Sequence, residues 1–353
     1  MDRYIGLDVH KASTTVAVVG PSGKHLKSVV VETTGEALIE AIRLIPSPRH
    51  VCLEEGTQSD WLYEILTAHA VRVVVVGIGA SRGPHRSKSD KGDAFNLANA
   101  LRLGNIETTV YKPKGEFRRL RYLANAYGKI VGDSTRNKNR IKAMYRSRGI
   151  STDDTLWYSP VNREKRLKLL PTSAQFAAGL LFEEQDMLSS LKKKAEKEML
   201  KEAKKHPISQ VLETCPGLGP IRVAELLSIV VTPHRFRTSR QFWGYCGLGL
   251  VTRTSAEWIQ DANNQWIKAH VPQTRGLNKN HNARLKHIYK GAATTVISRA
   301  NSSLYSDYQR LLEAGTKPNL AKLTVARKIA AISLAMWKNK EVYGVRGRSV
   351  KID

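Results

Sequence analysis

Two aspartates, Asp90 and Asp93, lie three positions apart at the start of a stretch with helical periodicity. Residues three apart lie on the same side of a helix, so the two carboxylates can reach one point. Carboxylates that close repel each other unless a cation lies between them, and their hard oxygen atoms suit Mg²⁺ or Mn²⁺. The alternative is an ordinary helix start, in which the acids cap the helix and complement its dipole.

Further acidic residues stand in or at the end of apolar runs. Asp8 lies inside an apolar run, where a carboxylate is costly to bury unless it is paired or binds a metal. Glu54 and Glu55 end a second apolar run. Alternation puts these two on opposite faces of a strand, so only one of them can join a site with Asp8.

The segments that carry these acids predict a mixed α/β sheet. Strand patterns over 4–19 and 25–31 favour an antiparallel meander of three strands. Helices and strands then alternate, and this order is typical of a mixed sheet. The run 71–76 is apolar apart from Arg72, which indicates a strand in the middle of a sheet covered on both faces. The later elements are a helix at 36–44, a strand at 51–55, a helix at 59–69 and the strand at 71–76.

The composition points to a polyanionic partner. The 353 residues include 57 Lys and Arg against 31 Asp and Glu, a net charge of +26, and nucleic acid is the simplest partner for such a chain. An anionic membrane is disfavoured, because no apolar run of about 18 residues and no signal peptide is visible. Cys52, Cys215 and Cys246 are isolated, which predicts neither a zinc site nor a disulfide framework and favours a reducing cytoplasm.

A helical pattern over 116–148 is studded with basic residues. Asp133 is the only acid between Arg118 and Arg148, so we expect this helix to follow phosphates rather than to be a merely solvated face. The candidate nucleic-acid contacts are Arg118, Arg119, Arg136, Arg140 and Arg146.

These patterns divide the chain into three regions: 1–150 with the sheet and the basic helix, 151–205 as connector and helical arm, and 206–345 as a mainly helical domain. In the arm, Leu181, Leu188, Leu191 and Ala195 form a broken heptad, so a dimer contact and an exposed spacer helix both remain open. If that helix stays extended, it separates the third region from the acids by roughly 40 Å.

A helix-hairpin-helix pattern opens the third region. Pro216-Gly217-Leu218-Gly219 joins two helical segments. Gly217 and Gly219 would let backbone N–H groups approach a phosphate at the start of the second helix. A helical hairpin without any ligand is the alternative.

The acidic segments resemble those of DEDD transposases of the IS110 family of bacterial insertion sequences. The matching stretches are 5–11 (Ile-Gly-Leu-Asp-Val-His-Lys), 55–58 (Glu-Gly-Thr-Gln) and 88–94 (Lys-Ser-Asp-Lys-Gly-Asp-Ala). The resemblance implies a RuvC-like N-terminal domain of the ribonuclease H fold. It also implies a Mg²⁺-binding tetrad, with Mn²⁺ as a substitute, made of Asp8, Glu55, Asp90 and Asp93.

The family pattern Glu-x-Thr-Gly selects Glu55 over Glu54, because Thr57 then falls in place. Gln58 stands where glycine is usual.

The C-terminal region is similar to the same family in three short motifs. Gly247-Leu248, Ser255 and the helix start at Asn282 occur in the family's order, which implies that Ser255 is a nucleophile. Ala256 departs from the usual glycine after the serine. Thr254 and Ser239 therefore remain alternative nucleophiles.

The resemblance implies a transposase that cleaves and rejoins donor and target DNA, guided by a structured bridge RNA. It further implies a homodimer that assembles into a tetramer, in a bacterial cytoplasm and at the nucleoid when active, with no membrane partner. Two other interpretations stay open. One is a RuvC-type metal-dependent junction nuclease that uses water, and the other is a basic nucleic-acid-binding protein without catalysis.

Overall fold

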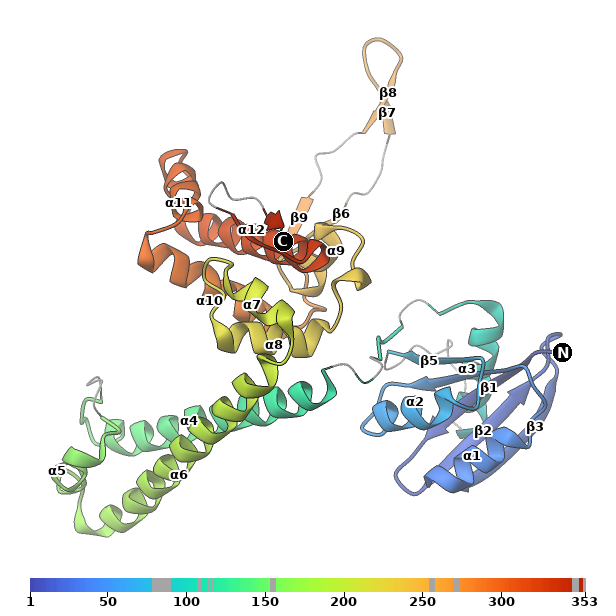
Figure 1. The fold of residues 1–353 in the computed structure, drawn as a ribbon, viewed down its shortest axis with the longest axis horizontal. Helices are drawn as coiled ribbons and strands as arrows, with labels where there is room; N and C mark the ends of the chain where they lie inside the picture. The colour runs from blue at the N-terminus through green and yellow to red at the C-terminus, as the bar shows by residue number, and fades with distance from the viewer. Residues whose placement is uncertain are drawn as a thin grey trace. The chain divides into compact units, whose positions relative to one another are not determined.

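The computed structural model of the chain describes residues 1–77, 90–106, 109–112, 115, 117–152, 157–253, 258–268, 273–344 and 349–351 (Figure 1). The chain divides into two compact units, Met1–Gly115 and Glu116–Asp353.

The first unit is built on one sheet with the strand order β3-β2-β1-β4-β5. The first three strands form the predicted antiparallel meander, whereas β4 joins β1, and β5 joins β4, in parallel. This is the mixed five-stranded sheet expected of a ribonuclease H-like domain. Its elements are β1 (Arg3–Val9), β2 (Ser13–Val19), β3 (His25–Glu32), α1 (Gly35–Arg43), β4 (Arg49–Glu54), α2 (Ser59–Thr67), β5 (Arg72–Val76) and α3 (Asp90–Leu103).

Helices cover both faces of this sheet. On one face, Leu62 of α2 shares an apolar core with Leu7 of β1 and Leu53 of β4. On the other face, Leu97 of α3 shares a core with Cys52 of β4. These two cores show the face toward which each residue of the central strands points.

β5 is the outer strand of the sheet, which corrects its predicted place in the middle. Its run is apolar because both faces are covered: Val75 joins the core of α1 and α2, while Val74 and Val76 join the core of α3. On its outer edge, the Val75 carbonyl accepts a hydrogen bond from the Val110 N–H at 2.7 Å, and Val76 forms a bridge to Thr109.

The second unit is mostly helical. Its elements are α4 (Arg118–Arg146), η1 (Pro160–Asn162), α5 (Arg163–Leu167), α6 (Thr172–Ala203), α7 (Pro207–Glu213), α8 (Pro220–Val230), η2 (Pro233–Arg235), α9 (Ser239–Tyr245), β6 (Leu250–Arg253), β7 (Trp258–Gln260), β8 (Trp266–Lys268), β9 (Gln273–Leu277), α10 (Ala283–Arg299), α11 (Ser303–Glu313), α12 (Pro318–Asn339), β10 (Glu341–Tyr343) and β11 (Ser349–Lys351).

α4 and α6 lie side by side as an antiparallel pair, and this pair with α5 is termed the helical arm (Figure 1). At one end of the arm, Ile141 of α4 shares an apolar cluster with Phe182 of α6. At the other end, Ala124 of α4 and Met199 of α6 join the main core of the second unit. α4 therefore runs away from the main core of the second unit, and α6 returns to it.

The chain enters and leaves the helical arm at neighbouring positions. Phe117, just before α4, packs against His206, just before α7, with the two rings tilted and 4.3 Å between their centroids. α6 is thus not an extended spacer, because α4 covers the same length in the opposite direction. α4 also groups with the second unit, although the predicted first region ran to residue 150, because Leu120 and Tyr127 are buried in the C-terminal core.

The C-terminal core surrounds α12, which buries Val325, Ile329 and Ala330 among the other helices as its apolar sequence predicts. The three cysteines are free and buried. None of the helices in the described ranges combines the length and the apolar character needed to cross a membrane.

Replacing Gly6 should loosen the contact between β1 and α3. A Cβ on Gly6 would lie 1.9 Å from the Ala94 carbonyl oxygen and 2.7 Å from the Ala98 nitrogen, so the helix would have to move. We expect Gly6→Ala to lower the free energy of unfolding of the first unit by about 1–3 kcal/mol in a urea titration. Gly20→Ala is the control, since its Cβ would meet only the Leu26 side chain at 3.5 Å. Equal stability of both variants would contradict a tight contact at Gly6.

Candidate active site

Asp8 lies near the end of β1, on the sheet face that α3 covers. Strand alternation places it on the face of Gly6, which meets Ala94 of α3, while Leu7 enters the opposite core. α3 begins at Asp90, so its first turn lies next to Asp8. The close approach at Gly6 therefore brings together two acidic segments that are far apart in the sequence.

Asp8, His10 and Asp90 form a cluster whose ligand atoms lie within 4.8 Å of one another. His10 Nε2 is 3.3 Å from Asp8 Oδ2 and 3.6 Å from Asp90 Oδ2. The Asp8 side chain is 22% exposed, against 53% for His10 and 67% for Asp90. One largely buried carboxylate and two exposed groups form an open site that an oxygen ligand from outside can reach.

Burial raises the pKa of Asp8 above its ordinary value, His10 lowers it, and the charges of Asp90 and Asp93 raise it further. Asp93 is therefore close enough to repel Asp8. A bound cation would relieve this repulsion, and three of the four predicted metal ligands are thus neighbours. The sequence interpretation did not assign His10 a role, although its place two residues after Asp8 could have indicated one.

The strand geometry separates Glu54 from Glu55. Leu53 enters the core of α1 and α2, and Cys52 enters the core of α3, so Glu54 at the end of β4 points to the α3 face. The parallel register of β1 and β4 ends at the pair Leu7 and Leu53, and Asp8 and Glu54 are the next residues of the two strands. Strand alternation thus makes Glu54 a candidate ligand beside Glu55, which the sequence pattern favours.

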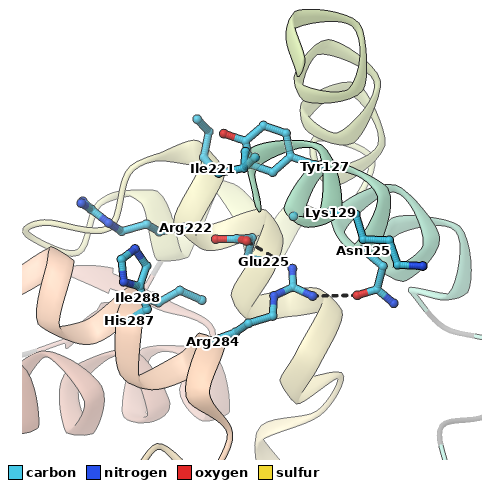
Figure 2. A pocket seen from close by; sticks show the side chains of 11 residues that line it. Asn125, Tyr127, Lys129, Ile221, Arg222, Glu225, Arg284, His287 and Ile288 are labelled. Atoms are coloured by element: carbon cyan, nitrogen blue, oxygen red, sulfur yellow. Dashed lines mark hydrogen bonds and ion pairs between the residues drawn. The ribbon is translucent and has the colours of Figure 1, made fainter. Parts of the chain in front are cut away.

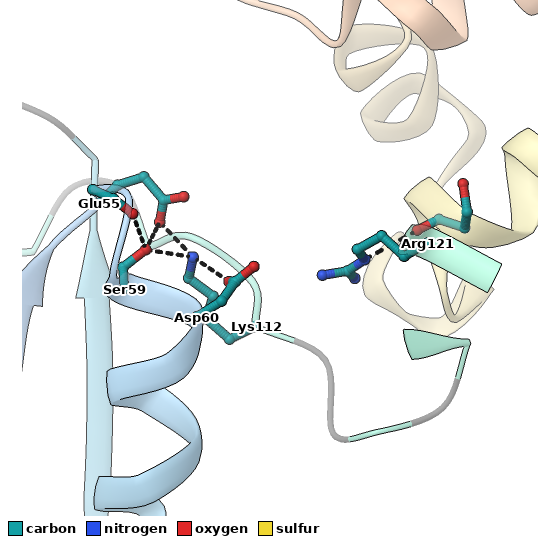
Figure 3. A network of polar contacts seen from close by, with 7 residues as sticks. Glu55, Ser59, Asp60, Lys112 and Arg121 are labelled. Carbon is teal, nitrogen blue, oxygen red and sulfur yellow. Dashed lines mark hydrogen bonds and ion pairs between the residues drawn. The ribbon is translucent and has the colours of Figure 1, made fainter. Parts of the chain in front are cut away.

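Glu55 belongs to a different network, built around the buried side chain of Lys112 (Figure 3). Lys112 Nζ lies 2.7 Å from Glu55 Oε2 and 2.6 Å from Asp60 Oδ1, and it donates to Ser59 Oγ at 2.9 Å. The Ser59 hydroxyl also donates to Glu55 at 3.2 Å. Glu55 therefore neutralises a buried ammonium group and joins the start of α2 to the segment after β5.

Ser255 and its alternative Thr254 lie outside the described residues. The other alternative, Ser239, is the first residue of α9. It comes directly after the capping residue Thr238, whose side-chain oxygen accepts from the Gln241 N–H at 3.3 Å. This position gives Ser239 an ordinary place in a helix start.

Two motifs that flank Ser255 in the sequence are fixed by local geometry. Gly247 has φ +67°, and a Cβ there would lie 2.3 Å from His281 Cδ2, so only glycine fits. Asn282 is the N-cap of α10, with its Oδ1 accepting from the Leu285 N–H at 3.1 Å. The Asn282 N–H also donates to the Tyr245 carbonyl at 2.9 Å, which ties α10 to α9.

The basic helix α4 is partly neutralised by its neighbour α6. Arg119 lies 3.2 Å from Glu202, Arg140 lies 3.9 Å from Glu184, and Arg136 pairs with Asp133 on α4 itself. The sequence interpretation counted acids along α4 alone and so missed those that folding brings across. Arg118 and Arg146 also interact within the protein.

The loop between α7 and α8 has the expected hairpin form, but its two glycines differ. Gly217 has φ +81°, and a Cβ there would lie 2.5 Å from the Ala292 carbonyl oxygen of α10, so packing requires glycine. Gly219 is the N-cap of α8, and nothing lies within 4 Å of its Cβ position. Of the two glycines predicted to contact a phosphate, Gly219 has more free space around it.

A cleft of about 550 Å³ lies between α4, α8 and α10 (Figure 2). Arg284 of α10 joins the three helices, because it donates to Asn125 of α4 at 2.6 Å and lies 3.2 Å from Glu225 of α8. Lys129 and His287, both exposed, also line the cleft. Its charge is therefore mainly positive.

Comparison with known families covers both parts of the chain. A family model described as Transposase matches residues 5–147, which carry the sheet, the acidic cluster and α4. A second model, described as Transposase IS116/IS110/IS902 family, matches residues 209–309, from α7 to α11.

The chain belongs to the IS110 family of transposases.

Two curated relatives agree with this assignment. An insertion element IS116 protein of Streptomyces clavuligerus, described as an uncharacterized 44.8 kDa protein, is 21% identical over 96% of each chain. The transposase for insertion sequence element IS1533 of Leptospira borgpetersenii is 26% identical over 47% of this chain and 50% of its own length. Membership in the IS110 family implies an enzyme that binds DNA and cleaves and transfers its strands.

Removing the charge of Asp8 should stabilise the metal-free protein and remove its response to metal. The folded-state pKa of Asp8 is raised, so the stability that its neutral form contributes is lost as the pH rises through that pKa. We expect Asp8→Asn to raise the free energy of unfolding at pH 7 by about 1 kcal/mol or less. Added Mg²⁺ or Mn²⁺ should raise the melting temperature of the wild type and of Asp2→Asn, but not of Asp8→Asn. An intact metal response in Asp8→Asn would contradict a metal role for Asp8.

Proposed function

We propose that this IS110-family transposase cleaves DNA at a metal site formed by Asp8, Glu54, Asp90 and Asp93, with Ser255 as the nucleophile. The observation that carries the proposal is the convergence of Asp8, His10 and Asp90, which brings the end of β1 to the first turn of α3. Glu54 is proposed in place of Glu55 because strand alternation turns it to the sheet face of Asp8, whereas Glu55 pairs with Lys112.

The residues present fit a hard divalent cation. Carboxylate oxygens from Asp8, Asp90, Asp93 and Glu54 are the ligands that Mg²⁺ and Mn²⁺ prefer. When bound, the metal neutralises the scissile phosphate and stabilises charge on the attacking and leaving oxygens. His10 lies within reach of Asp8 and Asp90, so it helps to orient both carboxylates.

Ser255 would attack the scissile phosphorus through its hydroxyl oxygen. One P–O bond forms to the serine as the bond to the leaving sugar oxygen breaks, and the hydroxyl proton is finally taken by that oxygen. The number of phosphoester bonds is unchanged, so the covalent intermediate retains the energy for rejoining. A serine hydroxyl is a weak nucleophile at its free pKa and needs activation, which a site of this kind can supply.

A bridge RNA is proposed as the source of sequence selection. The net charge of +26 gives the chain affinity for phosphates of either nucleic acid, and base pairing with a guide would then read the donor and target sequences. The proposed phosphate contacts are Arg118, Arg119, Arg136, Arg140, Arg146 and Gly219.

Self-association through the helical arm is proposed from an exposed apolar stripe on α6. Phe176, Leu180, Met187 and Leu191 are 79%, 51%, 66% and 40% exposed and recur at helical spacing. Much of the seam predicted from the sequence is used within the chain, since Leu181 and Ala195 pack against the arm cluster and the main core. The stripe is the outer face of the arm and suits the same stripe of a second copy, as a first step to a tetramer.

Substitution of the two neighbouring glutamates separates the site geometry from the sequence pattern. We expect Glu54→Gln and Asp90→Asn to lower strand cleavage in Mg²⁺ by at least a hundredfold while DNA binding stays within twofold. Glu55→Gln is the matched control and should keep cleavage, although it should lower thermal stability through the loss of its bond to Lys112. Full cleavage by Glu54→Gln with none by Glu55→Gln would overturn the assignment.

The same assay distinguishes the serine mechanism from its rivals. A denaturing gel should show a covalent protein–DNA adduct with the wild type and none with Ser255→Ala. Cleavage without an adduct would indicate a junction nuclease that uses water. No cleavage under any condition, with DNA binding intact, would indicate a binding protein without catalysis.

Charged substitutions in the stripe should weaken self-association. Phe176→Glu combined with Met187→Glu adds two negative charges to the exposed face, and we expect the dimer dissociation constant to rise at least tenfold in sedimentation equilibrium. Lys193→Glu is the control, because it makes the same change of net charge at an exposed position on another side of α6. Equal effects of the two variants would mean that charge, and not the stripe, governs the association.

A further inference from the structure

β7 and β8 form a two-stranded antiparallel ribbon, termed the tryptophan hairpin, over Trp258–Lys268 (Figure 1). Four large apolar side chains of this ribbon are exposed: Trp258 at 52%, Trp266 at 63%, Ile259 at 47% and Ile267 at 43%. A ribbon of two strands has no core of its own, so packing within the ribbon does not account for these side chains. This concentration of exposed apolar surface indicates a binding element.

The register divides the ribbon into two different faces. Ile259 pairs directly with Ile267, which gives one face a small aliphatic patch. Trp258 pairs with Lys268, and Gln260 pairs with Trp266, so the two tryptophans lie diagonally on the other face. Diagonal neighbours on a strand pair are within reach of aromatic side chains, so the indole rings can form one platform.

The turn of the hairpin is held firmly by one aspartate. Asp261 Oδ1 accepts from the Asn263 N–H at 2.8 Å and from the Gln265 N–H at 2.9 Å. The backbone adds Asp261 N–H to the Gln265 carbonyl at 2.9 Å, and Asn264 adopts a left-handed φ of 63°. The platform is therefore ordered before it meets a partner, which reduces the entropy lost on binding.

We propose that the tryptophan hairpin is a DNA-binding element in which Trp258 and Trp266 stack on exposed nucleobases. Every base offers a flat π-face, and aromatic platforms beside basic residues are the usual means of holding unpaired strands. Ser255 precedes Trp258 by three residues, so the choice of DNA over other polymers rests on the proposed function. The hairpin would hold bases next to the scissile phosphate.

The composition around the ribbon favours nucleic acid over a protein partner. Between residues 250 and 282 the chain has four Lys and Arg residues, Arg253, Lys268, Arg275 and Lys279, against Glu257 and Asp261. The Asp261 carboxylate is already engaged by the turn. The residues paired with the two tryptophans in the backbone register are Lys268 and Gln260, whereas the buried centre of a protein interface is depleted of charge.

The test compares polymers with and without bases, using the full chain with Asp8→Asn so that the DNA stays intact. Trp258→Ala with Trp266→Ala should weaken binding to a fluorescein-labelled single-stranded DNA of mixed sequence at least tenfold. Binding to heparin, a polyanion without bases, should change less than twofold. The variant with both residues replaced by Phe should recover most of the DNA affinity, because the rings and the strand propensity are retained.

Controls within the hairpin separate stacking from folding and from contact with a second copy. Ile259→Thr with Ile267→Thr keeps the strand propensity and should leave DNA binding unchanged. Quenching of the fluorescence of 2-aminopurine in the DNA should depend on the tryptophans and not on Trp61, the exposed tryptophan of α2.

Three results would overturn the proposal: equal losses for DNA and heparin, a larger loss for single-stranded RNA than for DNA, or altered self-association with unchanged DNA affinity. These binding measurements do not require cleavage, so a missing Ser255 adduct would refute the proposed chemistry without deciding the role of the hairpin.

Discussion

The absence of a side chain at Gly6 governs the geometry of the first unit. The backbone of α3 at Ala94 rests directly on β1 there, at a distance that no Cβ allows. This contact fixes the first turn of α3 over the end of β1, where Asp90 and Asp93 meet Asp8. The carboxylates repel one another, and the apolar cores on both faces of the sheet hold them in place. The protein thus keeps a locally unfavourable charge arrangement that a cation can relieve, as is common at functional sites.

Much of this arrangement could be predicted from local patterns, because strand alternation and helix spacing are local properties. The meander, the order of helices and strands and the acidic helix start can all be obtained from them. Glu54 and Glu55 show that a sequence motif and a strand pattern can favour different residues. A linear pattern around Thr57 favoured Glu55, but the direction of each side chain depends on where β4 ends. Counting alternation from the buried Leu53 turns Glu54 to the face of Asp8 instead.

Other features depend on contacts between distant segments, so they cannot be predicted from a local sequence pattern. The acids of α6 that neutralise Arg119 and Arg140 are more than forty residues away, and folding alone brings them to α4. Lys112 likewise meets Glu55 through the chain after β5, where the sequence shows only two lysines on either side of Pro113. The outer position of β5 was missed for a related reason, since a strand covered on both faces has the same composition at the edge as in the middle.

The closure of the arm at Phe117 and His206 makes it a modular insertion. Because the arm leaves the second unit and re-enters it at one point, deletions of equal length in α4 and α6 would shorten it without moving either end. If each helix lost or gained two complete turns, about seven residues, the side chains that pack between α4 and α6 would stay on the facing sides of the helices. Evolution can therefore adjust the reach of the arm while the acidic cluster and the C-terminal core stay unchanged.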